Sequence, residues 1–180
     1  MAVTRTPRSS WVQEGLRALA SGGPDAVRVE PIARALGVTK GGFYWHFDDR
    51  VALLDEMLEA WERIGVDDVI ARVDRDGGDA RTKLRRLFTV SGGGSVKVDL
   101  AFREWARRDR KVARRMRRVD NRRMDYLRSL YSEFCSSEDD VESRAMLTYS
   151  LWIGSRFIGA DHGTRSRSQV IEAIYAQLVR

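Results

Sequence analysis

Residues 29–50 read VEPIARALGVTKGGFYWHFDDR, and the interpretation of the whole chain depends on them. Apolar residues recur at helical spacing up to Leu36, and Gly37 follows where a left-handed helix end is expected. Thr39 can then accept a backbone N–H and open a second helix over residues 40–46. The pattern predicts two short helices joined by a tight turn, as in DNA-binding helix-turn-helix units.

The expected second helix has side chains suited to phosphate contact and side chains suited to core packing. Lys40, Tyr44 and His46 carry hydrogen-bond donors suited to phosphate oxygens. Phe43 and Phe47 are four residues apart, so they share one face and can anchor the helix to a core. An ordinary amphipathic helix with an aromatic core stripe has the same periodicity, so spacing alone leaves both interpretations open.

A longer motif extends this pattern. The run IAxxLGVTKGxFYxHF at residues 32–47, followed by DDRxxLL at residues 48–54, resembles the DNA-binding domain of the TetR family of transcriptional regulators. The resemblance covers about residues 9–58, and the rest of the chain is similar to the family only in length and helical character. It implies an all-α fold of about nine helices, with an N-terminal three-helix DNA-binding domain and a larger C-terminal helical domain.

The same resemblance implies roles for individual residues. Arg50 stands where a lysine usually holds the DNA backbone, and Arg28 stands where relatives often have a helix-capping Thr or Ser. Gly41 and Gly42 match positions that face the major groove, where relatives often carry Ser or Thr in place of Gly42. Each glycine weakens a helix by about 1 kcal/mol relative to alanine and offers no side chain to a base. The DNA-binding residues expected are Arg28, Thr39, Lys40, Gly41, Gly42, Phe43, Tyr44, His46 and Arg50.

The expected domains are residues 1–50 for DNA binding and residues 51–180 for regulation and dimerisation, linked by a helix over residues 49–73. Ser9 or Ser10 is expected to cap the first helix, and Ser136–Ser137 a later one. The other helices are expected at residues 11–21, 29–36, 80–90, 96–107, 111–134, 141–158 and 169–179.

Composition restricts the classes of protein to consider. The 180 residues are 43% hydrophobic with only 3 Pro, which is enough apolar material for a helical core. The N-terminus lacks the apolar segment of a signal peptide, and no apolar run could span a membrane, so a cytoplasmic protein with no membrane partner is expected. Cys135 is the only cysteine, which excludes an internal disulfide and a multi-cysteine metal site.

The positive charge of the chain is concentrated in one segment. The net charge is +6, and residues 103–128 alone contain twelve basic and four acidic side chains, whereas residues 1–50 contain seven and five. Three interpretations remain open: a solvated helix face, a second surface for DNA phosphates, or an anion-binding wall of a ligand pocket.

The last two helices have apolar residues around most of their circumference, which favours packing on several sides. We expect them to form half of a four-helix dimer interface, with a monomer core as the alternative. The residues expected at the interface are Tyr149, Trp152, Ile153, Phe157, Ile171, Ile174, Tyr175 and Leu178. Large inward-facing aromatics suggest a pocket for a small-molecule effector lined by Phe88, Phe102, Trp105, Met116, Tyr126, Tyr149, Trp152 and Arg156.

An enzyme is not expected. Only His46 and His162 are present, and no catalytic triad, metal motif or cofactor motif can be drawn. The expected function is a ligand-responsive repressor that binds a palindromic operator in double-stranded DNA as a homodimer. The alternative is a protein that coats DNA with low specificity.

Overall fold

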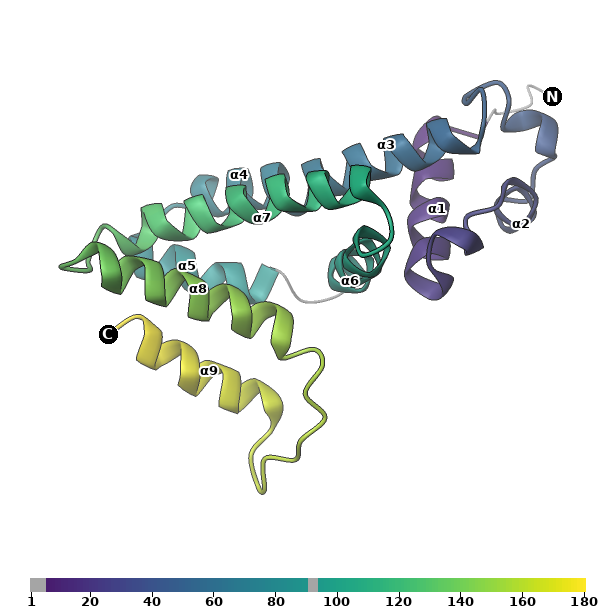
Figure 1. The fold of residues 1–180 in the computed structure, drawn as a ribbon. Coiled ribbons are helices and arrows are strands. Elements are labelled where there is room, and N and C mark those ends of the chain that lie inside the picture. The colour runs from purple at the N-terminus through teal and green to yellow at the C-terminus, as the bar shows by residue number, and fades with distance from the viewer. Residues whose placement is uncertain (1–5, 91–93) are drawn as a thin grey trace. The chain divides into compact units, whose positions relative to one another are not determined.

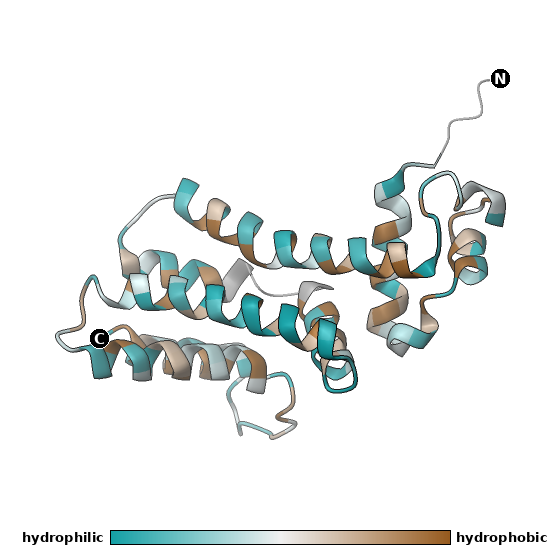
Figure 2. Ribbon diagram, turned by 45° about the horizontal axis from the view of Figure 1, so that its top comes forward, coloured by the Kyte–Doolittle hydropathy of each residue, from teal (hydrophilic) through white to brown (hydrophobic). Residues whose placement is uncertain are grey.

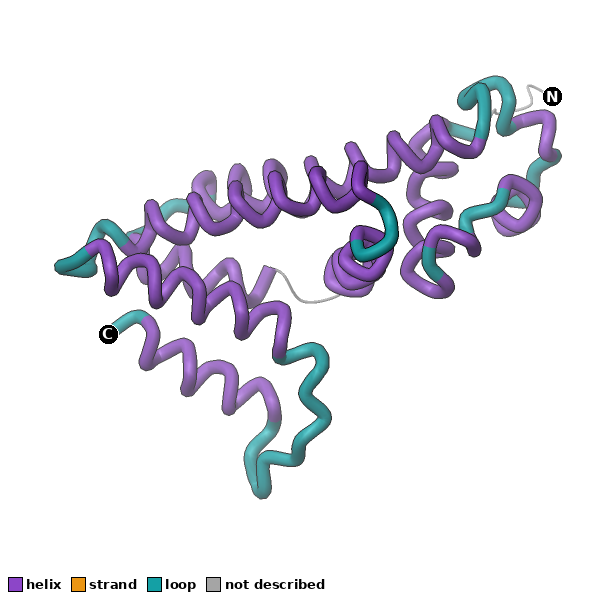
Figure 3. Tube along the Cα trace, viewed as in Figure 1, coloured by secondary structure: helices purple, strands orange, loops and turns teal. Residues whose placement is uncertain are grey.

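The computed structural model describes residues 6–90 and 94–180, apart from the side chains of residues 88–90 and 94–95. Every regular element in these residues is a helix (Figure 3), which confirms the all-α prediction. The chain forms two compact units, unit 1 (Met1–Asp68 and Gly92–Val119) and unit 2 (Val69–Ser91 and Asp120–Arg180). These units do not follow the expected boundary at residue 50.

Unit 1 is built around α1 (Arg8–Gly22), which packs against α2 (Val29–Ala35), α3 (Arg50–Glu62) and α6 (Gly94–Ala106) (Figure 1). This packing explains why a later segment groups with the N-terminal one. The helix begins directly after Pro7 and has no side-chain cap, so the expected cap at Ser9 or Ser10 is wrong. At the crossing of α1 and α3, a Cβ on Gly15 would lie 2.6 Å from Met57 Sδ, so glycine allows this close approach.

The expected helix over residues 49–73 is present with one irregularity. Asp49 caps α3 by accepting the Ala52 N–H at 2.8 Å. A π-helical turn, Arg63–Asp67, then leads into α4 (Asp68–Arg75). The chain therefore leaves the N-terminal domain along one nearly continuous helical segment.

Most of the basic segment lies on α7 (Arg110–Tyr131), and in unit 1 acidic side chains of α3 pair with part of it. Lys111 Nζ lies 2.6 Å from Asp55, while Arg115 and Arg118 lie 3.4 and 3.5 Å from Glu62. These pairs follow a helical repeat on both helices, and we call them the α3–α7 ion ladder. None of the three interpretations of the basic segment foresaw it, because charge counts do not reveal which helix lies opposite.

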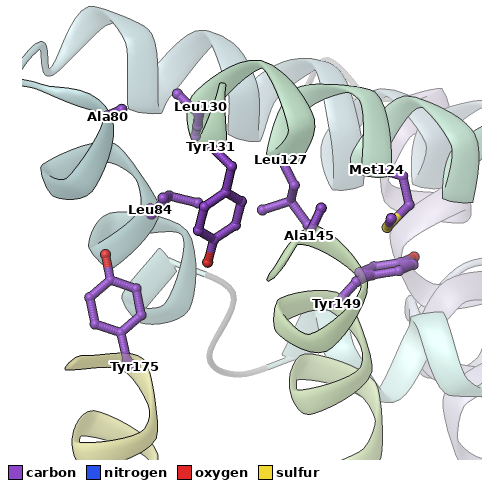
Figure 4. Close-up of a cluster of buried hydrophobic side chains, with 9 residues drawn as sticks. All are labelled: Ala80, Leu84, Met124, Leu127, Leu130, Tyr131, Ala145, Tyr149 and Tyr175. Carbon is purple, nitrogen blue, oxygen red and sulfur yellow. The ribbon is translucent and has the colours of Figure 1, made fainter. Parts of the chain in front are cut away.

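Unit 2 contains α5 (Ala80–Val90), the second half of α7, α8 (Glu138–Gly154) and α9 (Arg167–Leu178). Hydrophobic and hydrophilic positions alternate along the helices (Figure 2), as expected for helices with one buried face. The core of the unit (Figure 4) consists of Ala80, Leu84, Met124, Leu127, Leu130, Tyr131, Ala145, Tyr149 and Tyr175.

Tyrosine hydroxyls link the helices of unit 2. Burial raises the pKa of the Tyr126, Tyr131 and Tyr175 phenols, so these groups stay protonated and can donate. The hydroxyl links are Tyr126 to Asp74 (2.8 Å), Tyr131 with Thr148 (2.6 Å), Tyr149 to Asp120 (2.7 Å) and Tyr175 to the Arg81 carbonyl oxygen (2.6 Å).

The expected cap on α8 is confirmed, since Ser137 Oγ accepts the Asp140 N–H at 3.2 Å. The helix ends at Gly154 rather than at residue 158, and Arg167 holds the following loop by donating to the carbonyl oxygens of Ser155 and Ile158. Across the described ranges, no helix has the length and hydropathy needed to span a membrane.

Candidate nucleic-acid interface

The turn after α2 forms as the sequence predicted. Leu36 ends the helix, and Gly37 takes the left-handed conformation with φ of 68°. The Val38 N–H donates to the Ala33 carbonyl oxygen at 2.9 Å, which closes the last turn of α2. The chain therefore changes direction sharply before residue 39.

Residues 39–47, which we call the recognition turn, are less regular than expected. Lys40–Gly42 form a 3₁₀ turn, and the following residues continue as turns rather than as a helix over residues 40–46. Thr39 precedes the 3₁₀ turn but makes no side-chain cap, so its expected capping role is wrong. Adjacent glycines are poor helix formers, and a tight 3₁₀ turn suits such a short segment.

The inner face of the recognition turn is aromatic. Phe43 is 0% exposed and packs edge-on against Trp11, with ring centroids 5.4 Å apart. Phe47 stacks on Phe43 at 5.1 Å. The prediction that these two phenylalanines anchor the segment is confirmed. Phe43 is fully enclosed by the core, however, so its inclusion among the DNA contacts is wrong.

The outer face carries donors and bare backbone. Thr39, Lys40, Gly41 and Tyr44 are exposed. Lys40 Nζ lies 2.9 Å from Glu30 on α2, and this hydrogen bond, with a weaker electrostatic contribution from Tyr44, raises the pKa of Lys40. The ammonium group is therefore charged and open to solvent, as a phosphate contact requires.

Two of the expected phosphate contacts are bonded to backbone carbonyl oxygens near the turn. Arg50 Nε donates to the Val27 carbonyl oxygen at 2.6 Å, and its Nη2 donates to that of Pro24. His46 Nε2 lies 2.9 Å from the Thr6 carbonyl oxygen, to which it donates. Both side chains are half-buried, and their hydrogen bonds stabilise the position of the turn. Arg28, the remaining expected contact, is exposed beside α2.

Arg8 and Trp45 were not foreseen as site residues. Arg8 donates to Glu56 at 2.6 Å and to the His46 carbonyl oxygen, and its guanidinium lies 4.4 Å from the centre of the Phe47 ring. It therefore fastens the start of α1 to the recognition turn. Trp45 is 69% exposed. The sequence could have indicated that Trp45 is exposed, because Phe43 and Phe47 already occupy the inner face of the turn.

The expected effector-binding residues are divided between the units. Phe102, Trp105 and Met116 lie in unit 1, where Phe102 is fully buried and stacks against Trp105 at 5.9 Å. Tyr149 and Trp152 stack at 5.8 Å in unit 2. Tyr126 and Arg156 also lie in unit 2, and the Phe88 side chain is outside the described residues.

Two of the expected dimer residues are core residues of the protomer. Tyr149 and Tyr175 are buried within unit 2, because their rings pack in its core and their hydroxyls bond to neighbouring helices. Phe157, which is also expected at the interface, is exposed, as are the nearby apolar side chains of Met146, Leu147 and Ile158.

The short α2, the glycine turn and the braced recognition turn together form a helix-turn-helix DNA-binding domain. Residues 12–57 match the family model described as "Bacterial regulatory proteins, tetR family". The resemblance found in the sequence is thereby confirmed. Residues 12–57 are therefore a DNA-binding domain of the type found in the TetR family of transcriptional regulators.

Solved structures resemble the chain over nearly its whole length. FadR from Bacillus subtilis in complex with stearoyl-CoA has 13% identity and a TM-score of 0.70, covering 96% of this chain and 98% of its own. AibR in complex with isovaleryl coenzyme A and operator DNA has 16% identity and a TM-score of 0.69, with coverages of 94% and 96%. The ketosteroid regulator KstR2 of Mycobacterium tuberculosis has 19% identity and a TM-score of 0.61, with coverages of 98% and 94%. These likenesses support the two-part helical fold. No match was found among curated proteins.

Proposed function

We propose that this protein is a ligand-responsive repressor that binds a palindromic operator as a homodimer. The observation that carries the proposal is the two-faced recognition turn. Its aromatic inner face is fixed on Trp11, while Thr39, Lys40 and Tyr44 present donors on the exposed side. A short rigid segment of this kind suits insertion into the major groove with phosphate contacts on either side.

Homodimerisation is supported by an apolar groove on α8 and α9. The groove has a volume of about 460 Å³ and is lined by Leu147, Ser150, Leu151, Gly154, Ser155, Ile158, Ile174, Gln177 and Leu178. Pairing these helices with those of a second copy would bury the exposed Leu147 and Ile158. A two-fold dimer presents two recognition turns to half-sites separated by one DNA turn or a multiple of it. Its operator is therefore expected to be palindromic.

Effector control would follow from unequal affinity of a small molecule for two conformations of the regulatory domain. FadR and AibR were each solved with an acyl-CoA, so acyl-CoA thioesters are the first effectors to test. Release of operator DNA on addition of such a thioester would support the repressor assignment.

A DNA-coating protein remains the second candidate, because Arg110, Arg114 and Arg117 are exposed and have no ion-pair partner among the described residues. Selection of bound duplexes from a random pool, followed by competition with random DNA, separates the two functions. A specific regulator prefers its selected site by about 10³-fold or more at physiological salt. An equal affinity for selected and random duplexes would overturn the proposal.

Lys40→Ala tests the contact surface of the recognition turn. If Lys40 neutralises one phosphate, the slope of log affinity against log salt should fall by about one unit. Glu30→Gln is the matched control, because it removes the partner of Lys40 without removing the ammonium group, so the slope should be retained. An unchanged slope in Lys40→Ala would remove Lys40 from the phosphate contacts.

A further inference from the structure

The adjacent glycines of the recognition turn, Gly41 and Gly42, differ from glycines that the fold requires. Gly37 needs to be glycine because its φ of +68° is unfavourable for other residues. Gly15 needs to be glycine because a Cβ there would lie 2.6 Å from Met57 Sδ. Positive φ at Gly37 and close packing at Gly15 are thus two structural reasons for glycine.

Neither reason applies to Gly41 or Gly42. Neither residue has a positive φ. A Cβ on Gly41 would lie 3.7 Å from Thr39 Oγ1, and a Cβ on Gly42 would lie 3.7 Å from Trp11 Cζ2, both ordinary van der Waals distances. Alanine therefore fits at both positions without any shift of the neighbouring atoms.

The two glycines also have costs for the domain. They weaken helix formation, and the segment is a 3₁₀ turn where a longer helix was expected. The ring of Trp11 lies next to Gly42, so a methyl group at residue 42 would gain an ordinary apolar contact that glycine lacks. The protein alone thus supplies no stabilising reason for the absence of side chains at residues 41 and 42.

We propose that Gly41 and Gly42 together determine DNA specificity by leaving the backbone of the recognition turn bare. This inference rests on the proposed function. Gly41 is exposed and Gly42 is half-buried, between the phosphate-binding donors of Lys40 and Tyr44. Without a Cβ at either position, the main chain can approach the base edges of the major groove more closely than a turn bearing side chains. Discrimination between sequences then depends on this close approach and on DNA shape.

The test compares Gly41→Ala and Gly42→Ala with the wild-type protein, using the duplex that the wild type selects and a random duplex of equal length. Gly159→Ala is the matched control, because a Cβ there has no neighbour within 4 Å, φ is not positive and the residue lies in unit 2. Thermal unfolding and both affinities are measured for each protein.

We expect each recognition-turn variant to unfold at the wild-type temperature or higher, and to lose at least tenfold in preference for the selected duplex. The control should retain both properties. A preference within threefold of wild type would overturn the inference while leaving the proposed function intact, because the wild type would still select its duplex. A fall of several degrees in either variant's unfolding temperature would also overturn it, by showing that the fold requires glycine. If the wild type selects no duplex, the proposed function itself fails.

Discussion

At the scale of single residues, the recognition turn places core side chains and solvent-exposed side chains at consecutive positions. Phe43 and Phe47 face the core, whereas Lys40 and Tyr44 face solvent. Half-buried Arg50 is grouped by sequence with the DNA contacts, but its guanidinium binds backbone carbonyls. Residue type alone therefore does not assign a role, because a guanidinium group can donate to a phosphate or to a carbonyl oxygen.

Alanine substitutions at residues 43 and 44 should affect different properties, stability at residue 43 and operator binding at residue 44. Phe43→Ala leaves a cavity beside Trp11 and should lower the free energy of unfolding by about 3–5 kcal/mol, measured by urea denaturation. Tyr44 is 55% exposed, so Tyr44→Ala should change stability by less than about 0.5 kcal/mol while weakening operator binding. A stable Phe43→Ala variant, or full operator affinity in Tyr44→Ala, would contradict this division.

At the scale of elements, the N-terminal half of α7 presents two kinds of arginine. Arg115 is 18% exposed and pairs with α3, whereas the adjacent Arg114 is exposed and has no ion-pair partner among the described residues. The α3–α7 ion ladder links a helix that begins at the recognition turn to one that continues into unit 2. It gives part of the basic segment a structural role, while the unpaired arginines remain a solvated or anion-binding face.

The adjacent arginines should therefore respond differently to the same substitution. Arg115→Met leaves Glu62 without its nearest partner and should cost about 1–2 kcal/mol, between the values typical of exposed and buried pairs. Arg114→Met should stay within about 0.5 kcal/mol of wild type. Urea unfolding at low and high salt measures both effects. High salt should reduce the difference in unfolding free energy between the two variants, because it screens the α3–α7 ion ladder. Equal stabilities of the two variants would show that the ladder contributes nothing measurable.

At the scale of the whole molecule, the proposed dimer depends on apolar surface that the protomer leaves uncovered. Leu147 and Ile158 are exposed along the groove of α8 and α9, although the core of unit 2 is otherwise well enclosed. A dimer can bind two half-sites at once with its two recognition turns, whereas a monomer binds only one. Operator affinity should therefore depend on dimerisation.

Leu147→Glu should produce a monomer, because it places a charge in the groove that a second copy would cover. Ile64→Glu is the control, since Ile64 is an exposed apolar residue of unit 1 outside the groove. Sedimentation velocity measures the oligomeric state, and operator affinity should fall with the dimer. A dimer that persists in Leu147→Glu would exclude the groove as the interface.

The sequence by itself determined the features that depend on neighbours along the chain. Helical periodicity and few prolines indicated the all-α class, Gly37 marked the end of α2, and Ser137 marked a helix start. The aromatic anchor was also predictable, because residues four apart in a helical turn share one face. The motif then gave the family, since it fixes residue types at many consecutive positions.

Only the tertiary structure decided which side chains are already engaged. Arg50 meets a carbonyl 23 residues away, Lys111 meets Asp55 at a separation of 56, and the Tyr149 hydroxyl meets Asp120 at a separation of 29. Periodicity carries no information about such pairs, because it describes a helix face without stating what lies against it. Hence packing removed Phe43 from the expected DNA contacts and Tyr149 and Tyr175 from the expected dimer interface, and it showed Arg50 and His46 bonded to backbone carbonyl oxygens.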